Sequence, residues 1–156
     1  MPAPSSAQTD TDREIVVSRI IEGPRNLVFE MFTDVEHLSQ WWGPKGGITT
    51  KSFEFRPGGV WDATIKGPGG AGAYPNYVVW KEIVRPERIV WLYGTKKDDP
   101  NTVETILTLT EQAGSTEATL RLVFGSKEAR DQAAKYNAAD GAKQSLDRLA
   151  AAVTPK

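Results

Sequence analysis

The chain of 156 residues contains no cysteine, only one histidine, and no apolar run that approaches the length of a membrane span. The lack of cysteine excludes disulfide bonds, thiolate metal sites and a cysteine nucleophile, and it suits a reducing compartment. A transmembrane helix needs about 20 apolar residues in succession, and the N-terminal segment lacks the basic and apolar regions of a secretory signal. These absences predict a cytoplasmic protein without a membrane span.

The chain also lacks an excess of charge of either sign, since it has 19 Lys and Arg residues and 20 Asp and Glu residues. No basic stripe is present, and nucleic acid is therefore not an expected partner, because phosphates are bound by clustered cations. The length suits one domain. We expect residues 1–12 to form a disordered tail and residues 13–154 to form a single domain.

Short alternating segments separated by turn residues dominate most of the chain. They predict strands at residues 13–21, 48–55, 59–66, 77–84, 89–94, 103–111 and 116–124. Along the last of these, Ala118, Leu120, Leu122 and Phe124 alternate with polar residues, which predicts one buried face. The connections among the last six strands are short, so these neighbours should pair antiparallel.

Helices are predicted near both ends of this run of strands. One should extend from Pro24 to Phe32, and a second, capped by Asp34, should carry Trp41. Ser126 should cap a long C-terminal helix. Its apolar stripe consists of Ala129, Ala133, Tyr136, Ala139, Ala142, Leu146, Leu149 and Val153.

The C-terminal helix is too long to remain straight in a domain of this size. An unbroken helix over residues 127–153 would be about 40 Å long, whereas the expected radius of gyration is about 15 Å. We expect a break or bend, and Asn137 and Gly141 are the residues where the helix is weakest.

The segregation of strands and helices predicts an α+β fold, with a curved antiparallel sheet of six or seven strands wrapped around the C-terminal helix. The helix stripe is mainly alanine, which cannot fill a deep concavity. Either large aromatic side chains of the sheet fill it, or a cavity remains for a ligand. The candidate ligand-binding residues are Trp41, Trp61, Trp80, Glu82, Trp91, Tyr93 and Tyr136.

Glu82 is the one charged residue among these candidates. Trp80 and Glu82 share one face of their strand, Lys81 and Ile83 share the other, and the pattern leaves open which face points inward. A carboxylate on the inner face would need a partner, for which Arg19 is a candidate.

Three motifs that could suggest other chemistry favour structural roles. The glycine run at 67–72 matches G-x-G-x-x-G, but a strand rather than a helix should follow it, so it is read as a hairpin loop. His37 has no second histidine to form a metal site and is read as a surface or capping residue. The acidic segment at 98–101 lacks the glycine and terminal glutamate of a calcium loop.

The sequence resembles a known family over nearly everything after residue 12. The motifs are VSRI at 17–20, Pro24, VF at 28–29, FTD at 32–34, HLSQWWGP at 37–44, RPGGVW at 56–61, YPN at 74–76, EIV at 82–84, PERIV at 86–90 and QSLDRL at 144–149. They are similar to bacterial homologues of the C-terminal domain of the heat-shock-protein ATPase activator, in the SRPBCC or START-like superfamily. The resemblance implies a helix-grip fold with a cavity between sheet and helix.

Two positions depart from what the resemblance leads us to expect. Many relatives carry an Asp-His pair where this chain has Leu92 and Tyr93, and others carry tryptophan where this chain has Ala142. The first difference removes a candidate acid or base. The second removes bulk beside the helix and would enlarge a cavity.

Three functions are compatible with this sequence. The first is binding of a small hydrophobic molecule, the second a cyclase- or dehydratase-like enzyme with Glu82 as its base, and the third a co-chaperone-like domain that binds a heat-shock ATPase. The first is favoured, with no catalytic residue, no cofactor and no metal. A monomer and a homodimer are both compatible with the sequence.

Overall fold

The computed structural model describes residues 11–42, 47–66 and 72–153. In chain order its elements are η1 (Thr11–Arg13), β1 (Glu14–Glu22), α2 (Arg25–Glu30), α3 (Val35–Leu38), β2 (Ile48–Phe53), β3 (Val60–Lys66), β4 (Ala73–Val84), β5 (Arg88–Gly94), β6 (Val103–Gln112), β7 (Ser115–Val123), α4 (Lys127–Lys135) and α5 (Ala138–Val153). Most of the predicted N-terminal tail and of the glycine run lies outside the described residues, as does the Gly-Pro pair at 43–44.

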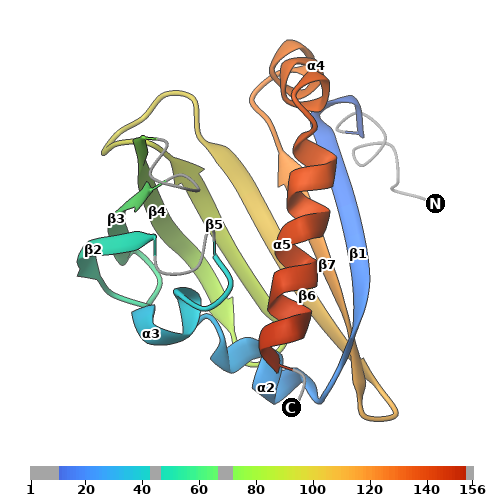
Figure 1. The fold of residues 1–156 in the computed structure, drawn as a ribbon. Helices are drawn as coiled ribbons and strands as arrows, with labels where there is room; N and C mark the ends of the chain where they lie inside the picture. Colours follow the sequence, from blue (N-terminus) through green and yellow to red (C-terminus); the bar gives the residue numbers. More distant parts are fainter. Residues whose placement is uncertain (1–10, 43–46, 67–71, 154–156) are drawn as a thin grey trace.

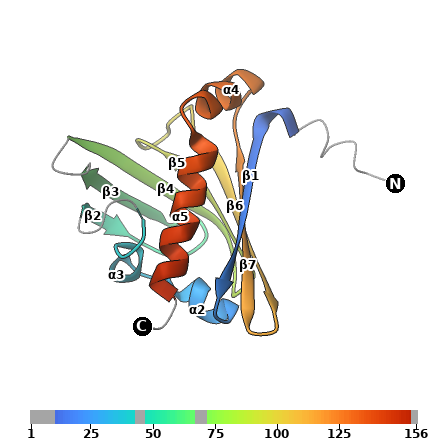
Figure 2. The same ribbon diagram turned by 45° about the vertical axis from the view of Figure 1, so that its right-hand side comes forward.

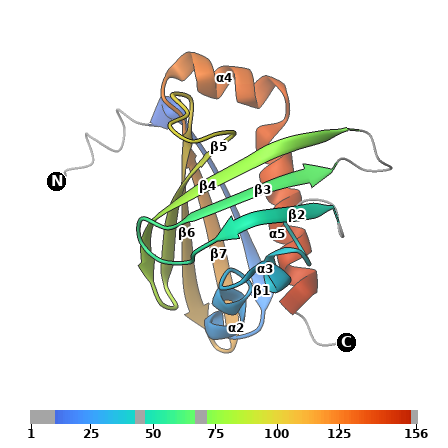
Figure 3. The ribbon, with the colours of Figure 1, turned by 90° about the vertical axis from the view of Figure 1, so that its left-hand side faces the viewer.

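The strands form one antiparallel sheet of seven strands in the order β1-β7-β6-β5-β4-β3-β2. The sheet curves, and α5 runs across its concave face (Figures 1 and 2). Helices α2 and α3 lie at one end of this face, while α4 lies beyond the opposite end (Figure 3). The predicted α+β helix-grip architecture is therefore confirmed.

Alternation along the strands sends apolar residues toward the helix, as the sequence predicts. Ala118 and Leu120 on β7 are buried, whereas Arg121, on the opposite face of the strand, is exposed. Leu120 lies opposite Leu107 on β6 and opposite Val17 on β1. The aligned register joins the inner residues of neighbouring strands into one continuous apolar surface.

Strand β4 begins earlier than the sequence pattern suggests. The pattern predicts a strand that starts at residue 77, but residues 73–76 also pair with β3, where Pro75 lies opposite Thr64. The pairing of β4 with β5 ends at Tyr77 and Gly94, so β4 is an edge strand beyond that point. An edge tolerates proline because no ladder hydrogen bond is required on the open side.

The predicted caps are present. The Asp34 side chain accepts a hydrogen bond from the His37 backbone N–H at 2.8 Å, and Ser126 Oγ accepts one from the Ala129 N–H at 3.0 Å. The helix that Asp34 caps is shorter than expected, because α3 ends at Leu38 and Trp41 follows it.

The C-terminal helix breaks at Asn137, one of the two residues predicted for this role. Asn137 has φ 64°, a left-handed conformation that asparagine adopts more readily than most residues. The break separates α4 from α5 and interrupts the helical phase. The expected stripe is consequently wrong in its first half, because Ala129 and Ala139 are exposed and α4 buries no residue.

Gly141, the other residue predicted for the break, lies inside α5 and allows a stability prediction. A Cβ atom at this position would meet no atom within 4 Å. We expect Gly141→Ala to raise the free energy of unfolding by about 0.5–1 kcal/mol, because alanine loses less backbone entropy in a helix. Urea denaturation measures this change. Asn137→Ala is the contrasting variant and should destabilise the protein by about 1–2 kcal/mol.

Candidate functional site

A pocket of about 380 Å³ lies between the concave face of the sheet and the first half of α5. It is lined by Phe32, Trp41, Trp42, Ile65, Tyr74, Trp91, Tyr93, Val103, Thr105, Leu107, Leu120, Leu122, Phe124, Ala138, Ala142, Ser145, Leu146 and Arg148. The lining is mainly apolar and comes from the sheet, from α5 and from the segment around α3.

The position of α5 explains why space remains. Among the strands, α5 packs most closely on β1, at one edge of the sheet. The helix face toward the pocket carries Ala138, Ala142 and Ser145, whose side chains are too short to reach the opposite strands. Trp91 and Tyr93 on β5 form the facing wall, and Thr105 lies beside Trp91 on β6.

Two tryptophans after α3 close the pocket from the side. The Trp41 indole N–H donates to the Met31 carbonyl at 3.0 Å, and its ring lies 4.9 Å from that of Phe32. Trp42 donates its indole N–H to Asn76 Oδ1 at 3.1 Å and makes an edge contact with Trp61. Each indole is therefore fixed by one hydrogen bond and by ring packing.

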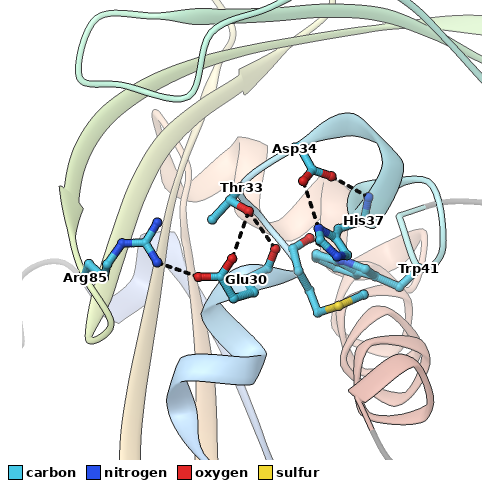
Figure 4. Close-up of polar contacts among 7 residues, drawn as sticks. Glu30, Thr33, Asp34, His37, Trp41 and Arg85 are labelled. Carbon is cyan, nitrogen blue, oxygen red and sulfur yellow. Dashed lines mark hydrogen bonds and ion pairs between the residues drawn. The ribbon is translucent and has the colours of Figure 1, made fainter.

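Polar contacts around α2 and α3 hold the segment that carries these tryptophans (Figure 4). Glu30 forms an ion pair of 2.6 Å with Arg85, which joins α2 to the turn after β4. The Thr33 hydroxyl donates to the Glu30 carbonyl at 2.9 Å. Asp34 also contacts the His37 ring at 3.0 Å, which agrees with the surface and capping role expected for this histidine.

Arg148 on α5 supplies the charged group of the pocket. Its side chain is half-buried, its Nε donates to the Trp41 carbonyl at 2.9 Å, and its Nη2 donates to Ser145 Oγ at 3.2 Å. Both acceptors belong to residues that line the pocket. The guanidinium group therefore lies at the pocket wall, between α5 and the α3 segment.

Of the seven residues predicted for the site, three line the pocket, two are buried beneath it and two lie outside it. Trp41, Trp91 and Tyr93 line the pocket. Trp61 and Trp80 face the same side of the sheet but are 0% exposed and do not line it. They belong to the buried ring cluster beneath the pocket, where Trp80 contacts Trp91 with ring centroids 5.7 Å apart.

Glu82 lies outside the pocket, which corrects the prediction. A β-bulge between Trp80 and Glu82 interrupts the alternation, so Lys81 and Glu82 are both exposed while Ile83 packs against the core. The expected partner is also wrong. Glu82 pairs with Arg88 at 2.8 Å, whereas Arg19 pairs with Asp147 at 2.8 Å.

Tyr136 also lies outside the pocket, because it ends α4 and is 72% exposed. Conversely, Trp42, Tyr74, Ser145 and Arg148 line the pocket, although they were not among the predicted residues. The sequence contains a pattern that predicts two of them. Ser145 and Arg148 follow Ala142 at successive three-residue steps and therefore lie on the same face of α5.

The Tyr93 hydroxyl gives the pocket a measurable pH response. Burial, followed by the electrostatic influence of Tyr74, raises the pKa of Tyr93 above its ordinary value of 10.0. The folded protein therefore retains this proton at a pH where the unfolded chain releases it. Its contribution to stability is complete below pH 10 and is lost as the pH rises through the folded-state pKa.

We therefore expect the free energy of unfolding to fall more steeply above pH 10 in the wild type than in Tyr93→Phe. Urea denaturation of both proteins at about pH 8 and at several values above pH 10 measures the difference. Parallel pH profiles for the two proteins would contradict a desolvated hydroxyl at this position.

Comparison with known proteins decides the family. The family model described as "Activator of Hsp90 ATPase homolog 1-like protein" matches residues 22–154. The chain belongs to this family. The assignment agrees with the resemblance drawn from the sequence motifs. None of the curated proteins with which this family member was compared matches its sequence.

Solved structures similar to this family member share its fold. A Nitrosomonas europaea protein has a TM-score of 0.79 at 20% identity, covering 92% of this chain and 95% of its own. A Mycobacterium smegmatis protein has a TM-score of 0.78 at 24% identity, covering 91% of each chain. An Arthrobacter aurescens protein has a TM-score of 0.80 at 19% identity, covering 91% of this chain and 86% of its own.

Two further observations concern the described ranges of this family member. None of the helices there is both long and apolar enough to cross a membrane. In the same ranges, no three His, Cys, Asp or Glu side chains gather where they could hold a metal ion.

Proposed function

We propose that this family member binds a small, mainly apolar molecule in the pocket between the sheet and α5. The observation that carries the proposal is a pocket of about 380 Å³ whose walls are mostly apolar and aromatic side chains. This volume falls within the range of roughly 300–1,000 Å³ that is usual for small-molecule sites.

Titration with the neutral fluorescent probe N-phenyl-1-naphthylamine tests this proposal. We expect saturable binding of one probe per chain, with quenching of tryptophan emission, because Trp41, Trp42 and Trp91 line the pocket. A response that grows linearly with probe concentration, without saturation, would overturn the proposal.

The cyclase-like alternative has lost its proposed base, because Glu82 is exposed and paired with Arg88. Among the described residues that line the pocket, none is a carboxylate or a histidine. General acid or base catalysis would need groups other than a carboxylate or a histidine. Binding without turnover is therefore the function that the lining supports better.

A co-chaperone-like role is the second candidate, because the family is named for activation of a chaperone ATPase. Val16 and Ile20 favour it weakly, since they are 49% and 53% exposed on the same face of the edge strand β1. Stoichiometric binding to a heat-shock ATPase, with stimulation of its turnover, would support this role. Lack of both effects would remove it.

A further inference from the structure

The charged side chain that lines the pocket is positive. Among the described residues that line the pocket, Arg148 is the only one of the types Asp, Glu, Lys, Arg and His. Its sequence neighbour Asp147 does not compensate it, because Asp147 is exposed and pairs with Arg19 on β1 at 2.8 Å. No described carboxylate forms an ion pair with Arg148. The pocket therefore presents a positive charge in mainly apolar surroundings.

The hydrogen bonds of Arg148 leave part of its donor capacity unused. A guanidinium group has five N–H donors in a planar fork. One on Nε and one on Nη2 have acceptors, at Trp41 and Ser145. The remaining three have no acceptor among the described residues. Since the two bonds fix the plane of the guanidinium group, its free donors are already oriented.

Neutral polar groups also border the pocket. The hydroxyls of Tyr93, Tyr74 and Thr105 belong to lining residues on the sheet side. The pKa of Tyr93 lies above its ordinary value of 10.0, so its phenol is neutral near pH 7 and can donate a hydrogen bond to an anion. A ligand that satisfies these groups needs hydrogen-bond acceptors at one end and an apolar body.

We propose that the ligand is an apolar molecule carrying one carboxylate, and that Arg148 binds this carboxylate. The proposal rests on the proposed function, because it names the ligand class of the same pocket. A carboxylate accepts two parallel N–H bonds from a guanidinium group, and charge-assisted bonds of this kind are about twice as strong as neutral ones. The apolar walls would then enclose the remainder of the molecule.

Competition between decanoate and 1-decanol measures the contribution of the carboxylate. Both share an apolar chain, and each is titrated at neutral pH against bound N-phenyl-1-naphthylamine. We expect decanoate to displace the probe from the wild type at a concentration about tenfold or more below that of 1-decanol. Arg148→Met should remove this preference and leave displacement by 1-decanol nearly unchanged.

Arg121→Met is the matched control, because it removes the same charge from the exposed, convex side of β7. It should retain the preference for decanoate. Equal displacement by the two compounds in the wild type would overturn the carboxylate proposal, a result that does not depend on the folding of any variant. So would an equal loss of affinity for both in Arg148→Met, since that indicates a purely structural role beside Trp41. A wild type that does not bind the neutral probe would instead overturn the proposed function.

Discussion

Replacement of Ala142 by tryptophan is expected to lower the affinity for N-phenyl-1-naphthylamine at least tenfold without unfolding the protein. Ala142 lies on the pocket face of α5, opposite the wall formed by Trp91 and Tyr93. An indole at this position would occupy much of a cavity of about 380 Å³. Because it enters existing space rather than a packed core, it should add apolar contacts instead of strain.

The matched control is Ala151→Trp, which places the same side chain on an exposed position of the same helix. Its affinity for the probe should equal that of the wild type. Thermal or urea unfolding should show that both variants are folded. Unchanged probe binding in Ala142→Trp would show that the probe occupies another part of the molecule, and the pocket would no longer be the candidate site.

The Ala142 variant also tests a departure from the family pattern. The sequence resemblance leads us to expect tryptophan at this position in some relatives. The shorter side chain leaves space that a tryptophan would reduce. Since the fold positions the helix through its packing on β1, the volume of the pocket is set by side chains such as Ala142 rather than by the backbone.

Trp80→Ala is expected to lower the free energy of unfolding by about 3–5 kcal/mol, the largest stability effect that we predict. Trp80 is 0% exposed, and its ring lies 4.9 Å from Phe55 and 5.7 Å from Trp91. No described residue accepts a hydrogen bond from its indole N–H, so the loss is one of packing. Urea denaturation followed by circular dichroism measures it.

Tyr136→Ala provides the comparison, because sequence reasoning placed both aromatic residues in the same site. Tyr136 is 72% exposed, and its truncation should change the free energy of unfolding by no more than about 0.5 kcal/mol. An effect below about 1.5 kcal/mol for Trp80→Ala would mean that the ring cluster does not form the packed base of the pocket.

Local chemistry accounts for the features that the sequence predicted correctly. Asp34 and Ser126 cap helices because their side chains accept hydrogen bonds from backbone groups three residues ahead. Asn137 breaks the C-terminal helix because it tolerates a left-handed conformation. The alternation in β7 predicts its buried face because side chains in a strand have a period of two.

Sequence patterns failed where one irregular residue changes the direction in which the neighbouring side chains point. The bulge at Lys81 turns Glu82 to solvent, although simple alternation places it on the face of Trp80. The break at Asn137 likewise separates Tyr136 from the helix face that lines the pocket. The identity of Lys81 does not reveal the bulge. Asn137 is a predicted break point, but the pattern does not show how far the break turns the helix face before it away from the helix face after it.

The sequence by itself determined the order of helices and strands along the chain of an α+β domain, its helix caps and the short side chains on the C-terminal helix, because these depend on neighbours within a few residues. Only the tertiary structure decided which aromatic residues border open space. Trp42 reaches the pocket through its bond to Asn76, and Arg148 through its bond to Trp41, contacts that join distant parts of the chain. Such contacts depend on how the helix and sheet pack together, and that packing is a property of the whole domain.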